Sequence, residues 1–212
     1  VEKELYPHEA EVERLDEVPA ELARHLQGRA IELGLYAANM PEALGGGGLN
    51  HFDITLMERE LGRASYGLQM LVARPSNILR ACQGEQIETY LLPTIRGERH
   101  DCLAMTEPNA GSDVRGMQTR ATRDGSGENA DYLINGTKHF ISHADEASFV
   151  ILFAATGEEH TPRGPKKLIT AFLIEKDFAG FSIGQKIDKM GMRGSPTAEL
   201  VFDDCFVPEE NV

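Results

Sequence analysis

The 212-residue sequence has no tryptophan, only three cysteines, and no apolar run near the roughly 20 residues that span a bilayer. Cys82, Cys102 and Cys205 are far apart and form no CxxC pair, so we expect no disulfide framework and unpaired, mostly buried thiols. The N-terminal stretch VEKELYPHEAEVERLDEV is acidic and lacks the apolar core of a signal peptide. The expected compartment is the cytoplasm, or the mitochondrial matrix in a eukaryote.

Positive charge is also scarce. Lys and Arg total 21 against 34 Asp and Glu, so the net charge is 21 − 34 = −13. A surface of this sign repels phosphate backbones, so we expect no nucleic-acid partner. Hydrophobic residues make up 41% and charged residues 26%, values typical of a globular chain with a buried core.

The first hundred residues carry helical periodicity. Apolar spacing predicts a helix over about 19–35 and a second from near Asn50 or Asp53 to Gly62. Two shorter stretches follow: residues 67–82, interrupted or kinked at Pro75, and residues 84–92, stopped by Pro93.

Beyond residue 100 the period becomes two. Short β-rich segments are expected at 103–105, 118–122, 132–134, 149–154, 168–174 and 198–202. Asn135-Gly136 predicts a type I′ hairpin, and Asp124–Gly127 predicts another turn. The predicted fold class is therefore α+β, with a helical domain over residues 1–100 and a small antiparallel β-barrel or orthogonal sandwich over residues 101–212.

Two tempting motifs fail on physical grounds. Gly45–Gly48 lacks the Lys and Ser/Thr of a phosphate loop and follows no strand. His139 and His143 fall on a predicted strand, where four residues span about 13 Å, too far for one metal ion. We therefore predict no metal site.

One constellation remains. The loop Met105–Asp113 combines hydroxyls, Gly111 and backbone N–H groups that could bind an anion. Phe140 and Ser142 are two residues apart and therefore share one strand face, which suits a planar heteroaromatic cofactor. Periodicity alone favours a plainer interpretation, a core Phe and a solvated Ser.

Three longer stretches carry a resemblance. LAMTEPNAGSDV, YLINGTKHFIS and GMRGSPTAELVFDDCFVPEENV, in this order and spacing, resemble the acyl-CoA dehydrogenase family. PEALGGGGLN and YLLPTIRGE in the helical half are similar to that family too. The resemblance covers essentially the whole chain.

The resemblance implies that the β domain binds FAD. Thr106 would hydrogen-bond the flavin pyrimidine side, and Ser112 would lie near both the pyrophosphate and the bound thioester. Phe140 holds the position of the ring-stacking aromatic, and Ser142 that of a hydroxyl reaching flavin N5. The implied cofactor-binding residues are Leu103, Ala104, Met105, Thr106, Glu107, Pro108, Asn109, Ala110, Gly111, Ser112, Phe140, Ile141 and Ser142, with Ser112 also binding substrate.

The implied reaction is α,β-dehydrogenation of an acyl-CoA thioester, in which a carboxylate removes the α-proton and flavin N5 receives the β-hydrogen as hydride. No catalytic residue is assigned, because family members carry the catalytic Glu in a C-terminal helical bundle and this chain stops at Val212. Glu58, Glu60 and Glu107 are interpreted as solvated or structural acids. We therefore expect negligible dehydrogenation by these residues alone.

The implied partners are an acyl-CoA substrate, electron-transferring flavoprotein or a similar acceptor, and further copies in a homodimer or homotetramer of the full-length protein. Three alternatives stay open: a related acyl-CoA oxidase, a flavin monooxygenase, and a non-catalytic two-domain binding or assembly module.

Overall fold

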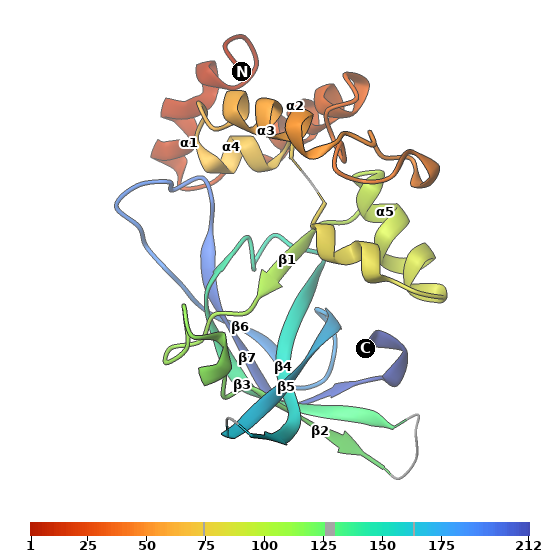
Figure 1. Ribbon diagram of the computed structural model, residues 1–212. Helices are drawn as coiled ribbons and strands as arrows, with labels where there is room; N and C mark the ends of the chain where they lie inside the picture. The colour runs from red at the N-terminus through yellow and green to blue at the C-terminus, as the bar shows by residue number, and fades with distance from the viewer. Residues whose placement is uncertain (74, 126–129, 163) are drawn as a thin grey trace. The chain divides into compact units, whose positions relative to one another are not determined.

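The computed structural model describes residues 1–212 except 74, 126–129 and 163 (Figure 1). It forms two compact units. The first contains Val1–His100 together with Asp188–Pro196, and the second contains Asp101–Ile187 together with Thr197–Val212. Helices fill the first unit and a single curled sheet fills the second, which confirms the predicted α+β fold class.

The helical unit is built from short helices. Its elements are η1 (Tyr6–His8), α1 (Glu9–Leu15), α2 (Ala20–Glu32), η2 (Glu42–Leu44), α3 (His51–Leu61), α4 (Tyr66–Met70), η3 (Asn77–Ala81), η4 (Ile87–Leu91) and α5 (Leu92–Ile95). The Asn50 side chain caps α3 by accepting the N–H groups of Phe52 and Asp53 at 2.9 and 3.1 Å. Gly62 follows the last turn, so the prediction for this helix is confirmed.

The prediction that Pro93 stops a helix is wrong. The π-helical turn η4 runs directly into α5, and Pro93 is the second residue of α5. A proline is tolerated there because first-turn N–H groups need no intrahelical partner. The interruption predicted at Pro75 is confirmed, because helix α4 ends before this residue and η3 begins after it.

The loop Asp188–Pro196 belongs to the helical unit although it connects two strands. A Cβ atom added to Gly67 would lie 2.2 Å from the carbonyl oxygen of Gly194, so the two glycine backbones meet directly. The Arg193 N–H donates to Glu13 Oε2 at 3.0 Å, and the Arg193 guanidinium lies 3.7 Å from the Asp16 carboxylate. These contacts hold the loop against α1 and α4.

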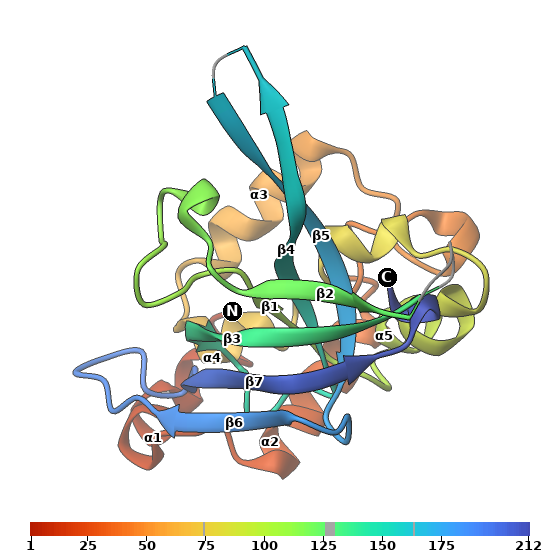
Figure 2. The same cartoon turned by 90° about the horizontal axis from the view of Figure 1, so that it is seen from below.

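Over its described residues, the β unit is one seven-stranded sheet in the order β1-β4-β2-β3-β7-β6, with β5 paired to β4. The strands are β1 (Asp101–Ala104), β2 (Arg120–Asp124), β3 (Asp131–Ser142), β4 (Phe149–Thr161), β5 (Gly164–Glu175), β6 (Phe181–Lys186) and β7 (Thr197–Val207). Figure 2 shows β2, β3, β7 and β6 side by side. Pairing is mostly antiparallel, but β1 runs parallel to β4, which the sequence did not predict.

The predicted hairpin at Asn135-Gly136 is wrong, because β3 runs through both residues. They lie at an irregularity in the pairing with β7. The Asn135 side chain exchanges two hydrogen bonds with Asp204, at 2.8 and 2.9 Å. A Cβ on Gly136 would lie 2.5 Å from Thr119 Oγ1, so glycine is needed here for close strand packing rather than for a turn. The turn predicted at Asp124–Gly127 lies partly outside the described residues.

The core of the β unit consists of small and aliphatic side chains with the aromatic rings of Tyr132, Phe172 and Phe202, and it includes Cys102 and Cys205. No cysteine forms a disulfide, and burial raises the pKa of Cys82 and Cys205 to about 11. Among the described residues, no helix is long and apolar enough to cross a membrane.

Candidate functional site

The loop after β1 is closed by its own backbone. The N–H of Glu107 donates to the Ala110 carbonyl at 2.9 Å, and the N–H of Ala110 donates back to the Glu107 carbonyl at 3.2 Å. Pro108 and Asn109 occupy the two central turn positions, which suit their backbone preferences. These bonds and the turn residues give the loop a defined shape.

Polar groups of this loop remain available to a ligand. In the part of the chain that the structure describes, the hydroxyls of Thr106, Ser112 and Ser142 have no hydrogen-bond partner. The backbone N–H groups of Gly111 and Ser112 likewise have no acceptor among the described residues. Exposed N–H groups beside a hydroxyl can bind an anionic group such as a phosphate.

Phe140 is exposed and strained. Its side chain is 59% exposed, and its φ of 59° lies in the left-handed region. Aromatic residues rarely adopt this conformation, which costs about 1–3 kcal/mol and clusters at functional sites. The plainer interpretation of Phe140 as a core residue is therefore wrong.

A β-bulge explains how Phe140 comes to face outward. Lys138 pairs with Leu200 and Ile141 with Ala198, so β3 has one extra residue between these pairs. Without it, Lys138 and Ile141 would face opposite sides of the sheet, since they are three residues apart. With it, both side chains are buried, and Phe140 and Ser142 are exposed on either side of Ile141.

A backbone hydrogen bond brings the two predicted parts of the site together. The N–H of His139, just before Phe140, donates to the carbonyl of Thr106 at 2.8 Å. The His139 ring lies against the Phe140 ring, with centroids 3.8 Å apart, and its Nδ1 is 2.7 Å from Glu199 Oε1. The loop Thr106–Ser112 and the outward face of β3 are thus neighbours.

The other predicted cofactor-binding residues differ in exposure. Leu103, Pro108, Asn109, Gly111 and Ser112 are exposed, and Met105 and Thr106 are half-buried. The side chains of the remaining predicted residues are buried, namely Ala104, Glu107, Ala110 and Ile141. We expect those four to shape the site rather than to contact a ligand through their side chains.

Glu107 forms a buried ion pair with Lys138. Lys138 Nζ lies 2.8 Å from Glu107 Oε1 and 3.0 Å from the Met105 carbonyl, and the Lys138 side chain is fully buried. The same carboxylate accepts the N–H groups of Gln118 and Thr119, at 2.6 and 2.9 Å. Burial raises the pKa of Glu107, but the bonds from Lys138 and these N–H groups outweigh it, so the pKa lies below its ordinary value.

Sequence reasoning missed Lys138. The sequence pattern could have indicated it. Lys138 is four residues after Ile134 on β3, and an even spacing along a strand puts the Lys138 side chain on the same face as the buried Ile134. Glu107 was correctly interpreted as a structural acid. Its two oxygens accept three hydrogen bonds, from Lys138 and from the N–H groups of Gln118 and Thr119.

The two histidines considered as metal ligands bind different carboxylates. His139 contacts Glu199, and His143 Nδ1 lies 2.9 Å from Glu146 Oε2. No group of three side chains suited to hold a metal occurs among the described residues.

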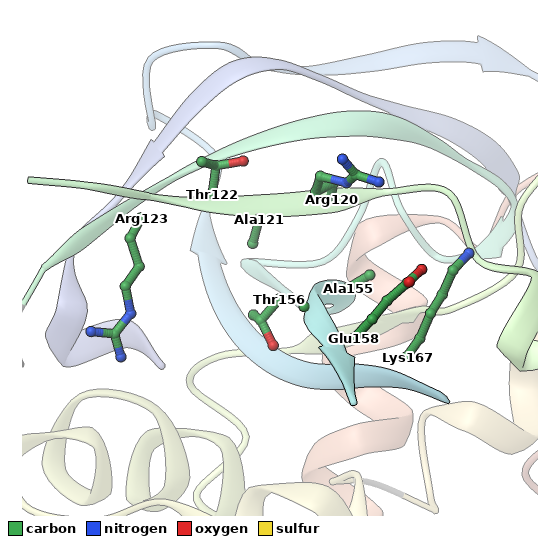
Figure 3. Close-up of a pocket in the computed structure, with 9 residues that line it drawn as sticks. Arg120, Ala121, Thr122, Arg123, Ala155, Thr156, Glu158 and Lys167 are labelled. Carbon is green, nitrogen blue, oxygen red and sulfur yellow. The ribbon is translucent and has the colours of Figure 1, made fainter. Parts of the chain in front are cut away.

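A cavity of about 560 Å³ lies between β2 and the β4–β5 hairpin (Figure 3). Its lining residues are Arg120, Ala121, Thr122, Arg123, Ala155, Thr156, Gly157, Glu158 and Lys167. None of the predicted flavin-site residues lines it. Lys167 donates to the Met117 carbonyl, and its backbone pairs across the hairpin with that of Glu158.

Comparison with known proteins agrees with the motifs. Residues 1–98 match the acyl-CoA dehydrogenase N-terminal domain, and residues 102–205 match the acyl-CoA dehydrogenase middle domain. The mitochondrial isovaleryl-CoA dehydrogenase of Arabidopsis thaliana is 38% identical over 98% of this chain and 50% of its own length.

Two solved structures are similar as well. A probable acyl-CoA dehydrogenase from Mycobacterium abscessus is 37% identical with a TM-score of 0.83, covering 100% of this chain and 54% of its own. A glutaryl-CoA dehydrogenase from Mycobacterium smegmatis in complex with FADH2 is 28% identical with a TM-score of 0.81, covering 99% and 51%. The chain spans about half the length of the curated relatives it matches, and it belongs to the acyl-CoA dehydrogenase family.

Proposed function

We propose that this chain supplies the flavin-binding and thioester-facing part of an FAD-dependent acyl-CoA dehydrogenase. The observation that carries the proposal is the exposed ring of Phe140, on a strained backbone, together with the hydroxyls of Thr106, Ser112 and Ser142, which have no partner among the described residues. In this proposal residues 101–212 form the cofactor domain and residues 1–100 the helical domain of the enzyme.

The residues present fit a flavin. The Phe140 ring offers an apolar surface on which a planar heteroaromatic ring can stack. The hydroxyls of Thr106 and Ser142 can donate to ring heteroatoms, and the N–H groups of Gly111 and Ser112 can bind a pyrophosphate. When bound, FAD supplies the acceptor for the hydride that leaves the β-carbon.

This chain's own residues then orient groups rather than transfer the α-proton. Ser112 is proposed to contact the acyl-CoA, and its loop keeps its shape through the Glu107–Ala110 backbone bonds. Glu107 is engaged and buried, so we assign no base among these residues. A carboxylate from the rest of the enzyme is required for that step.

The partners follow from the same proposal. They are an acyl-CoA substrate, electron-transferring flavoprotein or a similar acceptor, and further copies of the enzyme in a homodimer or homotetramer. The proposed location is the cytoplasm, or the mitochondrial matrix in a eukaryote; the Arabidopsis thaliana relative is a mitochondrial protein.

The first test is titration of the protein with FAD, alone and joined to the family's C-terminal helical domain. We expect FAD binding by the joined protein, and weaker binding after Ser142→Ala than after Ser182→Ala, an exposed serine on β6. The joined protein should reduce an artificial electron acceptor with acyl-CoAs. Absence of FAD binding would refute the proposal, while rapid oxygen consumption or dependence on a NADH-linked reductase would favour an oxidase or a monooxygenase.

A further inference from the structure

The buried pair Glu107–Lys138 joins three segments that are far apart in sequence. Lys138 Nζ donates to both Glu107 Oε1 and the Met105 carbonyl, at 2.8 and 3.0 Å. The carboxylate in turn accepts the N–H groups of Gln118 and Thr119. One ion pair therefore holds the end of β1, the start of β2 and the middle of β3.

The pair lies next to both parts of the proposed flavin site. On one side, Glu107 begins the loop that carries Ser112, and its backbone closes that loop on Ala110. On the other side, Lys138 is the last residue of β3 before the bulge that turns Phe140 outward. Because Lys138 is tied inward and Ile141 is buried, the extra residue can be accommodated only between them.

Two consecutive carbonyls are engaged in the same way. Lys138 Nζ binds the carbonyl of Met105, and the N–H of His139 binds that of Thr106 at 2.8 Å. The Thr106 hydroxyl is thereby held at a fixed place relative to Phe140. Breaking the pair would release Met105, and the loop and the bulge could then shift independently.

We propose that Glu107 and Lys138 are positioning residues for the flavin site. The pair sets the spacing between the loop hydroxyls and the Phe140 ring, and touches neither cofactor nor substrate. This inference rests on the proposed function, since it assumes that these groups meet a flavin. A displacement of about 1 Å in such a site can cost about a hundredfold in rate.

The test compares FAD binding by the wild-type protein joined to the C-terminal helical domain with that of the double variant Glu107→Gln/Lys138→Met. Removing both charges avoids leaving one buried and unpaired, so the double variant keeps its fold better than Lys138→Met alone. Lys186→Met is the matched control, because the ion pair that Lys186 forms within the described part of the chain is an exposed 3.9 Å contact with Asp145.

We expect the double variant to unfold cooperatively but to bind FAD roughly tenfold or more weakly, with a shifted flavin absorption spectrum and midpoint potential. The spectrum and potential distinguish positioning from a loss of stability, and Lys186→Met should leave both unchanged. Glu107→Asp keeps both charges but shortens the carboxylate side chain by one methylene group. It should therefore shift the flavin spectrum in the same direction as the double variant, but by a smaller amount.

A folded double variant, or a folded Glu107→Asp variant, with wild-type FAD affinity, spectrum and potential overturns this inference and leaves the proposed function intact. Failure of the wild-type protein itself to bind FAD overturns both.

Discussion

We expect the Phe140→Gly variant to be more stable than Phe140→Ala, although alanine is usually the more stable of the two residues in a strand. The φ of Phe140 is 59°, and a Cβ in this left-handed region costs about 1–2 kcal/mol. Alanine restricts the unfolded chain more than glycine does, by about 0.4–1 kcal/mol, which offsets part of that strain. Phe140→Gly should therefore exceed Phe140→Ala in free energy of unfolding by about 1 kcal/mol.

Ser142, on the same exposed face and without a positive φ, provides the control. At position 142 the usual order should hold, so Ser142→Ala should exceed Ser142→Gly in free energy of unfolding by about 0.5–1 kcal/mol. The chain has no tryptophan, so urea unfolding is best followed by circular dichroism. For m-values of about 2 kcal/mol/M the variants at position 140 should differ by about 0.5 M in midpoint. If Phe140→Ala is the more stable variant at position 140, the inferred strain is absent.

Three further predictions concern Glu107, two glycines and the ring at position 140. The pKa of Glu107 is lower in the folded protein than its value near 4.5 in the unfolded chain, so the ionised carboxylate stabilises the fold above pH 4.5. Below that pH this stabilisation is lost. In urea titrations at decreasing pH, the free energy of unfolding should therefore fall more steeply for the wild-type protein than for Glu107→Gln. Gly136→Ala should destabilise the protein by about 1–3 kcal/mol in the same assay, because its Cβ would lie 2.5 Å from Thr119 Oγ1. Gly28→Ala is the control: Gly28 lies in the middle of α2 with space for a Cβ, so this variant should be more stable by about 0.5–1 kcal/mol. Phe140→Trp should fold normally and provide a single tryptophan that bound FAD quenches; unchanged tryptophan emission on saturation with FAD would place the flavin elsewhere.

Local chemistry explains what could be predicted of the fold. Helix α3 was predictable because its ends are marked by Asn50, which caps it, and by Gly62, both within one turn of the helix. Pro93 misled because the same fixed φ that ends one helix suits the first turn of the next, and only the neighbouring turn decides between them. Asn135-Gly136 misled because the sequence does not reveal that Thr119 packs against Gly136.

The candidate site divides in the same way. The spacing of two residues placed Phe140 and Ser142 on one face, and both side chains are exposed, although Phe140 itself lies within the β-bulge between Lys138 and Ile141. That bulge was not predictable, because it follows a buried lysine whose partner, Glu107, is 31 residues away in the sequence. Only the folded sheet brings that pair together.

The membership of Asp188–Pro196 in the helical unit bears on how this family can be recombined. The chain passes between its two units three times, after His100, after Ile187 and after Pro196. A chimera of two relatives joined at residue 100 would therefore combine helices from one parent with a strand-connecting loop from the other. Gly67 and Gly194 would then come from different parents, although a side chain at position 67 would meet the Gly194 backbone and one at position 194 would meet Val12. Exchanging this loop together with the helices keeps both glycines from one parent.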